Sequence, residues 1–594
     1  MKCRVADIIM DCLIERGITD CFAVVGGGAM FLDNALLHCE KMTKYFNHHE
    51  QGCAMAAEAY ARSTGKMALV SVTSGPGGTN TLTGVMGAWV DSIPMIIISG
   101  QVRYAISVPQ SGLKLRTRGV QEFDIVNTVK TMTKYAKLVI NPLDIKMEIN
   151  KAIDIALSGR KGPVWLDIPQ DVQSAIIDTD EMTPIVELEA KENDFDMDYL
   201  HNALRSAKRP VFLVGGGVAA SNSRELFRKV ATKIRIPVVS SLNGADVLYR
   251  ENEMHLGPIG SCGQRSANFV IQNSDLIISI GCALGFSATG FSQKDFAPKA
   301  EIIAIDIDEE ELKKPGLRYN KQFTCDLNFA LNKILDSKIT YFAPNEWVEY
   351  CKTVKQRFSP YEAVKGREEG ERVCSYVFWQ KFYEKMPDDI CLVLGNNSAI
   401  TSALQIGNLK EKQHILTNFN CGSMGYDIPA ALGVAIAKGT EVYLATGDGS
   451  FMMNLQELQT ISHHNLPVKI ILFENAGYNA IRQTCKNFFK GEIIGCTPET
   501  GVSFPSFEKV AETFKFKYIK CESNGAIDSA LDKLLMAKGP TILEISQLLD
   551  DPVSPKVMSR TDENGKMLSP ALHDMYPFIS KDELNRLMIS EKGE

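Results

Sequence analysis

Short apolar runs alternate with amphipathic stretches along the first third of the chain. Residues 4–16 repeat apolar side chains at the spacing of a helix, and after Gly17 the apolar run Cys21–Val25 leads into three glycines. Three further apolar runs, each followed by a turn, predict buried strands at Met67–Thr73, Met95–Ser99 and Val164–Ile168. This alternation predicts a parallel β-sheet with helices on both faces.

The same alternation recurs twice further along the chain. In the second unit it predicts strands at Pro210–Val214, near Val238, at Leu276–Ile280 and at Ile302–Ile307. In the third unit it predicts strands at Ile390–Leu394, Val442–Thr446 and Val468–Phe473. The stretch Glu181–Asp198 and the residues from about 338 to 370 have no apolar period and are expected to be polar connections.

The pattern therefore predicts an α/β protein with three doubly wound parallel-sheet domains. The N-terminal domain is expected at residues 1–180, the central domain at 195–340 and the C-terminal domain at 365–550, followed by a charged tail at 551–594. A length of 594 residues agrees with this, because domains average roughly 150 residues.

Composition excludes several classes of protein. The 45% apolar and 23% charged residues are typical of a globular protein. The net charge of −7 and the lack of a basic tract argue against a nucleic-acid partner, and no apolar run approaches the roughly 20 residues that span a membrane. The 15 cysteines form no C-x-x-C pair, and acidic residues interrupt the N-terminal apolar stretch where a signal peptide would be apolar. We therefore expect a cytoplasmic protein.

The most specific motif is Gly447-Asp448-Gly449-Ser450, which follows a predicted strand, with Asn475 at the end of the next strand. Both side chains are then expected at the carboxyl ends of parallel strands, where open α/β sheets bind ligands. A carboxylate and an amide oxygen suit Mg²⁺, and a helix starting near Ser450 would present its positive end to a diphosphate. Taken alone, a Gly-Asp-Gly sequence is more often a simple tight turn.

Longer segments carry a family resemblance. The sequence Asn475-Ala476-Gly477-Tyr478 completes a pattern similar to the diphosphate motif of thiamine diphosphate enzymes. HEQGCAMAAEAYARSTGK from His49, TSGPGGTN, AWVDSIPMIIISGQV, QEFDIV and SGRKGPVWLDIPQDV follow one another as in the acetolactate synthase large subunit and its thiamine diphosphate-dependent relatives. The resemblance covers about residues 4–557.

The resemblance implies an enzyme that uses thiamine diphosphate and Mg²⁺. It would decarboxylate a 2-keto acid such as pyruvate and transfer the two-carbon acyl unit to a carbonyl acceptor, with the cofactor as electron sink. Glu50 would hydrogen-bond the aminopyrimidine ring and assist its proton transfers. The metal ligands would be Asp448, Asn475 and the backbone carbonyl of Gly477.

Further roles follow from the resemblance residue by residue. Gln121 matches the family's active-site glutamine, although Val120 replaces the aromatic residue before it. Gly26 and Gly27 match a turn whose amides stabilise an oxyanion, although Val25 replaces the proline of that turn. Met424 matches the residue that wedges between the cofactor's rings. The residues expected to bind the cofactor are Glu50, Asn396, Asn397, Gly422, Met424, Gly447, Asp448, Gly449, Ser450, Asn475, Gly477 and Tyr478.

The assembly follows from the resemblance as well. In this family Glu50 and Asp448 come to one cofactor from different subunits, so the smallest active unit is a homodimer, and dimers of dimers are common among relatives. The active sites would then lie at the subunit interface.

The chain departs from the family at the acceptor pocket. Thr484 replaces a tryptophan and Ala480 a second bulky residue, which predicts a wider acceptor pocket. One alternative is therefore the same chemistry on a nucleotide-linked keto-sugar in branched-sugar biosynthesis. Others are simple decarboxylation of a 2-keto acid and a non-catalytic paralogue, although the latter would tend to lose Glu50, Asp448 or Asn475.

The central domain departs from the family too. Where FAD-binding relatives carry paired arginines and aspartates, this chain has Ala283-Leu284-Gly285-Phe286-Ser287, although glycines at 215–217 remain. Binding of FAD is left open by these residues. Gln170 also replaces a lysine that lies in the substrate channel of relatives.

Overall fold

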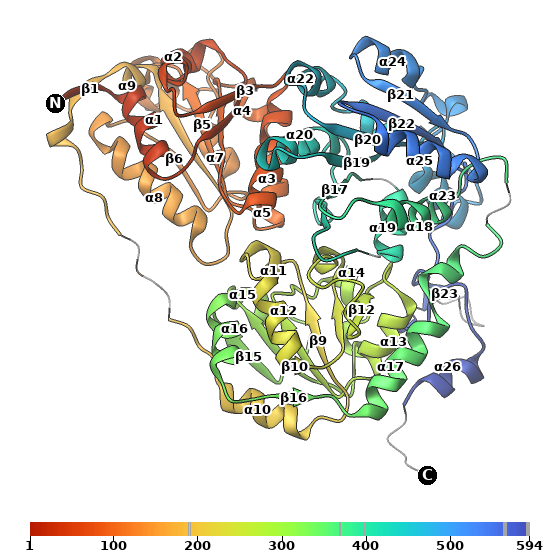
Figure 1. Cartoon of the computed structure of the whole chain (residues 1–594). Helices are drawn as coiled ribbons and strands as arrows, with labels where there is room; N and C mark the ends of the chain where they lie inside the picture. Colours follow the sequence, from red (N-terminus) through yellow and green to blue (C-terminus); the bar gives the residue numbers. More distant parts are fainter. Residues whose placement is uncertain are drawn as a thin grey trace.

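The computed structural model describes residues 1–594 except 188, 190–191, 368–369, 397, 408, 562–566, 569 and 590–594. It contains three six-stranded sheets, all of them parallel. Figure 1 shows the N-terminal domain in red and orange, the C-terminal domain beside it in teal and blue, and the central domain below both in yellow and green. The predicted fold class is confirmed.

The N-terminal sheet has the order β3-β2-β4-β5-β7-β6. Its strands are β2 Asp20–Ala23, β3 Thr43–Phe46, β4 Leu69–Val72, β5 Met95–Gln101, β6 Tyr135–Leu138 and β7 Pro163–Pro169. One face packs against α1 Val5–Glu15, α2 Met30–His38 and α8 Ile145–Leu157. The other packs against α3 Glu50–Thr64, α5 Leu82–Val90 and α7 Ile125–Val129. Alternate residues of β5 contribute to the two cores, as a strand buried on both faces requires.

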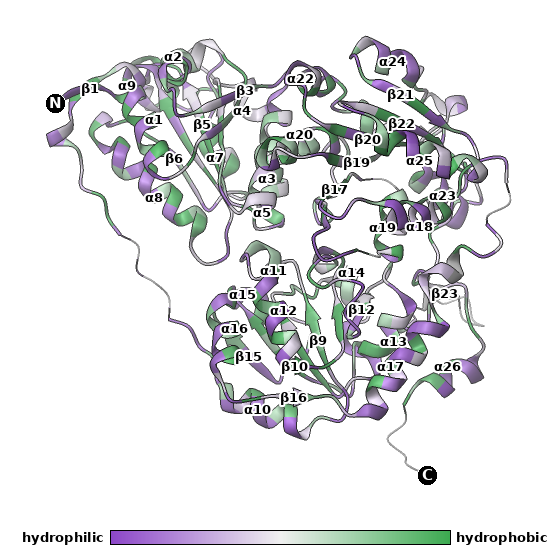
Figure 2. Cartoon of the chain, in the orientation of Figure 1, coloured by the Kyte–Doolittle hydropathy of each residue, from purple (hydrophilic) through white to green (hydrophobic). Residues whose placement is uncertain are grey.

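The central sheet has the order β12-β11-β9-β13-β14-β15. Its strands are β9 Pro210–Val214, β11 Val238–Ser240, β12 His255–Pro258, β13 Leu276–Ile280, β14 Glu301–Asp306 and β15 Lys321–Thr324. The helices around it include α10 Met197–Ser206, α12 Arg224–Lys233, α13 Arg265–Asn273, α16 Leu327–Asp336 and α17 Asn345–Arg357. In Figure 2 the strands of this sheet are green and the outer helices largely purple, as expected for an apolar layer covered by amphipathic helices.

The C-terminal sheet has the order β18-β17-β19-β20-β22-β21. Its strands are β17 Cys391–Leu394, β18 His414–Leu416, β19 Val442–Gly447, β20 Val468–Glu474, β21 Lys517–Cys521 and β22 Thr541–Ser546. The main helices are α18 Ser375–Lys385, α19 Ser398–Ile406, α20 Asp427–Lys438, α22 Glu457–His463, α23 Asn479–Phe488, α24 Phe507–Thr513 and α25 Ile527–Met536.

The expectation of a polar connection at about 338–370 was wrong for part of that stretch. Helix α17 lies there and buries Trp347, Cys351 and Val354, of which Trp347 and Cys351 belong to the central core. The indole of Trp347 also donates to the carbonyl of Pro210, at 3.0 Å. Val348 and Tyr350 pack partly buried against the same core. Charged residues interrupt these apolar positions, which is why the period was easy to miss.

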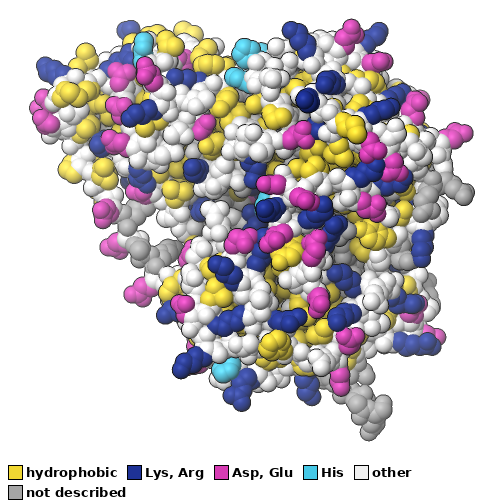
Figure 3. Space-filling model, viewed as in Figure 1, with side chains coloured by type: hydrophobic (Ala, Val, Ile, Leu, Met, Phe, Trp, Pro, Cys, Tyr) yellow, Lys and Arg dark blue, Asp and Glu magenta, His cyan; other side chains and the backbone are white. Residues whose placement is uncertain are grey.

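No helix among the described residues is both long and apolar enough to cross a membrane. On the face shown in Figure 3, positive and negative side chains are interspersed over all three domains.

The N- and C-terminal domains share one apolar core through α3 and α20. The two helices approach so closely at Gly433 that a Cβ there would lie 2.1 Å from the carbonyl oxygen of Ala56. At the same contact, the hydroxyl of Tyr426 donates to the buried carboxylate of Glu58, which also pairs with Arg62. A glycine is required at position 433 because any side chain would push the helices apart.

We expect Gly433→Ala to lower the free energy of unfolding by about 2 kcal/mol, because the new methyl group overpacks this contact. Chemical denaturation measures the change. Gly285→Ala is the matched control, since nothing lies within 4 Å of a Cβ there and its φ is −69°. Equal stability of the two variants would contradict the close contact.

Candidate functional site

Glu50 is the first residue of α3, directly after β3, and only 9% of it is exposed. The ring nitrogen Nδ1 of His49 accepts a hydrogen bond from the amide of Gln51 and so caps the helix. The carboxylate accepts a hydrogen bond from the side-chain amide of Asn80, at 2.9 Å. A Cβ at Gly77 would lie 3.7 Å from the other carboxylate oxygen, so Glu50 faces the short helix α4, Pro76–Asn80.

Gly26 and Gly27 form the turn after β2, as expected. The amide of Gly26 donates to Asp33, at 3.0 Å, and a Cβ at Gly26 would lie 2.6 Å from Cβ of Thr73. Burial raises the pKa of Asp33 to about 6. Asp33 was not predicted from the sequence, because a single aspartate at helical spacing does not indicate a hydrogen bond with the Gly26 amide.

Gln121 lies in the loop after β5, with φ 59°, and its side chain is exposed. Its carbonyl oxygen would be 2.4 Å from a Cβ at Gly75, which directly precedes α4. Because Glu50 faces the same short helix, the loops after β2, β3, β4 and β5 bring Gly26, Glu50 and Gln121 to one edge of the N-terminal sheet. We call these three residues and Gly27 the first half-site.

Asp448 begins α21, Asp448–Met452, at the end of β19. Its buried carboxylate accepts hydrogen bonds from the amides of Gly449, Asn475 and Gly477, at 2.7, 3.0 and 3.2 Å. Burial raises its pKa to about 6. The two loops that were expected to carry the metal ligands therefore meet at this carboxylate.

The side chain of Asn475 is held from two sides. Its amide nitrogen donates to Gln547, at 3.0 Å, and its amide oxygen accepts from the guanidinium of Arg482, at 3.1 Å. Arg482 also donates to the backbone carbonyls of Asn475 and Leu549, at 2.9 and 2.7 Å. The amide oxygen keeps a second lone pair. Arg482 was not selected from the sequence, because a basic residue on a helix face is usually exposed.

Gly477 is a position that only glycine can occupy. Its φ is 148°, and a Cβ there would lie 2.0 Å from the carbonyl oxygen of Cys496. Asp448, Asn475 and Gly477 thus offer carboxylate, amide and carbonyl oxygens on adjacent loops, which are the ligands that Mg²⁺ prefers. We call this loop pair the second half-site.

The neighbours of this loop pair include further residues expected at the cofactor. A Cβ at Gly449 would lie 2.1 Å from the ring of Tyr478 and 3.2 Å from the methyl carbon of Met424. The amide of Gly425, next to Met424, donates to Ser450 at 2.9 Å. Asn396 is exposed and donates to the carbonyl of Gly422, whereas Asn397 lies outside the described residues.

Ala480 and Thr484 lie one turn apart on α23, and both are exposed. The hydroxyl of Thr484 donates to the carbonyl of Ala480, at 3.0 Å. They share this face with Ile481 and Phe488, which are 45% and 65% exposed. Within the part of the chain that the structure describes, the middle of this helix face at Ala480 and Thr484 is therefore exposed.

The two half-sites remain separate within one chain. The first lies at the edge of the N-terminal sheet and the second at the edge of the C-terminal sheet. No hydrogen bond or ion pair joins them among the residues that the structure describes. Nor do any three His, Cys, Asp or Glu side chains gather there into a metal centre.

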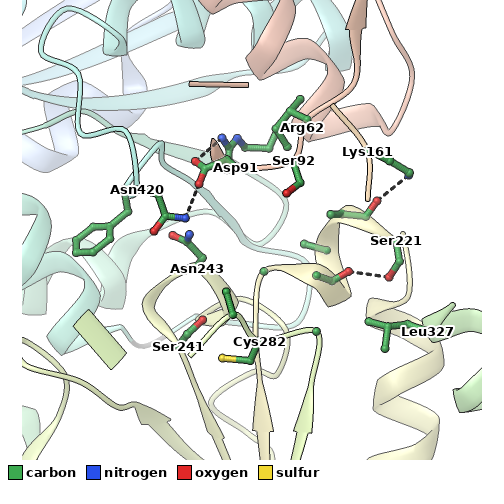
Figure 4. A pocket seen from close by; sticks show the side chains of 18 of the residues that line it. Arg62, Asp91, Ser92, Lys161, Ser221, Ser241, Asn243, Cys282, Leu327 and Asn420 are labelled. Carbon is green, nitrogen blue, oxygen red and sulfur yellow. Dashed lines mark hydrogen bonds and ion pairs between the residues drawn. The ribbon is translucent and has the colours of Figure 1, made fainter. Parts of the chain in front are cut away.

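A cavity of about 470 Å³ lies where the three domains meet. Figure 4 shows its wall built from Arg62, Asp91 and Ser92, from Asn420, and from Ser241, Asn243 and Cys282. The three arginines that line it are all paired with carboxylates: Arg62 with Glu58 and Asp91, Arg160 with Asp308 and Glu311, and Arg224 with Asp246. The segment at 283–285 lines this cavity without a charged side chain.

Comparisons with known proteins match one family model to each of the three domains. Residues 3–127 match the family model described as thiamine pyrophosphate enzyme, N-terminal TPP binding domain. Residues 197–327 match the central domain and residues 395–545 the C-terminal TPP binding domain of the same enzymes. The chain belongs to the thiamine pyrophosphate enzyme family.

Individual relatives narrow the likeness. The chain is 31% identical to acetolactate synthase isozyme 2 large subunit of Escherichia coli over 544 residues, 91% of this chain and 95% of that protein. It is also 31% identical to acetolactate synthase 2, chloroplastic, of Nicotiana tabacum over 587 residues, 93% of this chain and 83% of that protein. The chain is thus an enzyme of the acetolactate synthase-like type, as the sequence motifs predicted.

Proposed function

We propose that the protein is a decarboxylating carboligase that uses thiamine diphosphate and Mg²⁺. It would take a two-carbon acyl unit from pyruvate or a similar 2-keto acid and transfer the unit to a carbonyl acceptor. The observation that carries this proposal is the convergence of two loops on Asp448, where three backbone amides hold a carboxylate beside Asn475 and Gly477. Relatives named as acetolactate synthases support the same chemistry.

The chain's own residues suit distinct tasks. Asp448, Asn475 and Gly477 would hold the cation and, through it, the diphosphate, while Met424 and Tyr478 pack beside them. Glu50, oriented by Asn80, would hold a proton shared with the cofactor's ring. The amide of Gly27, with the Gln121 side chain, would donate to a developing oxyanion, whereas the amide of Gly26 is engaged by Asp33. When bound, thiamine diphosphate supplies the electron sink for decarboxylation.

A homodimer is the smallest assembly that the proposal requires, because the half-sites of one chain do not meet. Apolar side chains are exposed around both of them. Val120 and Val25, beside the first half-site, are 83% and 57% exposed, and Phe488 and Ile494, beyond the second, are 65% and 80% exposed. Pairing of these surfaces in a second copy would bury them and complete two sites, and a dimer of dimers satisfies the same requirement.

We do not include FAD in the proposal. The three arginines of the inter-domain cavity are engaged with protein carboxylates, which leaves Lys161 and Lys438 as the other Lys or Arg residues among those that line it. The segment that aligns with the flavin-binding residues of relatives contributes no charge. We retain the cytoplasm as the proposed compartment, in agreement with all fifteen cysteines being free thiols.

A nucleotide-linked keto-sugar is a second candidate acceptor. It is favoured by the exposed face of α23, where Ala480 and Thr484 leave more room than two bulky side chains would. Simple decarboxylation to an aldehyde is the outcome if no acceptor is used.

The central test is turnover of pyruvate by the purified protein with thiamine diphosphate and Mg²⁺. We expect release of carbon dioxide, and Glu50→Gln should lower its rate at least 100-fold, because general acid–base assistance is lost. Glu40→Gln, at an exposed carboxylate of the same domain, is the matched control and should keep the full rate. Carbon dioxide release by Glu50→Gln at the rate of the parent protein would disprove the role of Glu50.

Binding of thiamine diphosphate with Mg²⁺ should depend on the protonation of Asp448, whose pKa burial raises to about 6. In the free protein this group contributes stability at low pH that is lost as the pH rises through 6. Cation binding needs the ionised carboxylate, so the added ligands should raise the melting temperature more at pH 7.5 than at pH 5.5. Thermal unfolding with and without a chelator measures this.

In the same titration Asp448→Asn should lose both the stabilisation and its pH dependence. A variant that is still stabilised by the metal and cofactor to the same extent would exclude Asp448 as a ligand.

The acceptor prediction is tested at Thr484. Thr484→Trp should lower the rate with a nucleotide-linked keto-sugar at least tenfold, because the ring fills space that the large acceptor needs. The rate of condensation of two pyruvate molecules should not fall. Product analysis with each acceptor measures both. Thr484→Val keeps the volume and serves as the control. An equal loss with both acceptors would refute a steric role.

A further inference from the structure

The loop that leads to Gln121 carries an unusual concentration of positive charge. Between residues 103 and 118 it has four cations, Arg103, Lys114, Arg116 and Arg118, and no acidic residue, in a chain whose net charge is −7. All four side chains are exposed. The side chains of Arg103, Lys114 and Arg116 make no hydrogen bond or ion pair with any residue that the structure describes.

Buried and half-buried carboxylates hold this loop in shape without neutralising its cations directly. Glu122 accepts hydrogen bonds from the amides of Val108, Arg118 and Gly119. Asp171 accepts from the amide of Tyr104, at 2.9 Å. Both acids are engaged by backbone donors, so the loop has a defined conformation. Arg118 donates to the carbonyl of Ser107, at 3.2 Å, while the side chains of Arg103, Lys114 and Arg116 stay available.

The loop is also close to the first half-site. Arg118 precedes Gln121 by three residues, so their Cα atoms lie within about 10 Å. The carbonyl oxygen of Gln121 in turn lies against Gly75, at the start of the same helix α4 that Glu50 faces. An acceptor with its carbonyl carbon at the reacting centre would meet these cations if its far end follows this loop.

We propose that Lys114 and Arg116, with Arg118 beside them, bind the diphosphate of a nucleotide-linked acceptor. This inference rests on the proposed carboligase function and names the part of the acceptor that the chain recognises. Leu113 and Leu115, 62% and 46% exposed, alternate with the cations and would offer apolar contacts to the attached nucleoside. A small 2-keto acid acceptor is too short to use these residues.

The test compares a nucleotide-linked keto-sugar with the free keto-sugar, which lacks only the diphosphate and its nucleoside. Lys114→Gln combined with Arg116→Gln should raise KM for a nucleotide-linked keto-sugar about tenfold, a loss of about 1.4 kcal/mol, and change kcat less than twofold. KM for the free keto-sugar should stay the same. For the parent protein, KM for the linked acceptor should rise with ionic strength, and this dependence should be weaker in the variant.

Lys229→Gln combined with Lys338→Gln removes two exposed cations from the central domain and is the matched control. It should leave both KM values unchanged. Equal shifts in the control and in the loop variant, or equal effects on both acceptors, would overturn the assignment.

A binding measurement separates this inference from the proposed function. Calorimetric titration of a nucleoside diphosphate, with thiamine diphosphate and Mg²⁺ already saturating, should show about tenfold weaker binding to the loop variant. Inorganic pyrophosphate in a parallel titration distinguishes a general anion site from one that also uses the nucleoside. Carbon dioxide release from pyruvate with no difference in nucleotide binding would refute the loop site alone, whereas absence of carbon dioxide release would refute the carboligase.

Discussion

The contact between α3 and α20 determines where both halves of the site lie. Their backbones meet because Gly433 has no side chain to hold them apart from Ala56. Helix α3 begins with Glu50, and α20 begins directly after the turn at Gly425, which bonds to Ser450. Helix α3 thus fixes the position of Glu50, the catalytic carboxylate of the proposed mechanism. Helix α20, through the bond of Gly425 to Ser450, fixes the loop of Asp448.

Polar contacts extend this coupling next to the reacting groups. Glu457, fully buried at the start of α22, accepts hydrogen bonds from the side chain of Asn47 and the amide of His48. Asn454 donates to Gln51, at 2.9 Å. Asn47, His48 and Gln51 flank Glu50 in the N-terminal domain. Their partners, Asn454 and Glu457, follow Asp448 along the chain. A shift of one half-site within a subunit therefore displaces the other, although in the proposed dimer the two serve different cofactors.

The fold was predictable because buried parallel strands leave long apolar runs. Pro210–Val214 and Leu276–Ile280 were predicted with their observed bounds, and Met95–Ser99 was short by only two residues. The helix α17 was missed because only one narrow face of it is apolar. Periodicity reports how a segment packs on its own domain, so it carried no information about the contact of α3 with α20.

The loops of the site were predictable in kind because they lie in segments that resemble thiamine diphosphate enzymes, whereas a Gly-Asp-Gly sequence alone is more often a tight turn. The side chains that hold these loops in place were not predictable. Arg482 donates to the side chain of Asn475, and Asp33 accepts from the backbone amide of Gly26. No rule of residue spacing predicts either contact. The physical reason is that tertiary packing, and not local sequence, decides which polar side chains become buried.

Four of the residues that depart from the family, Val25, Val120, Ala480 and Thr484, lie at exposed positions around the half-sites. Gly477 and Gly26 cannot carry a side chain without a collision, and Asp448 is held by three amides, so this part of the structure tolerates little change. Ala480, Thr484 and the basic loop are exposed, and substitutions there alter shape and charge without disturbing that framework. A chain under these constraints can keep one set of reacting groups while its choice of acceptor changes, because the groups that we propose to select the acceptor are not those that we propose to hold the cofactor.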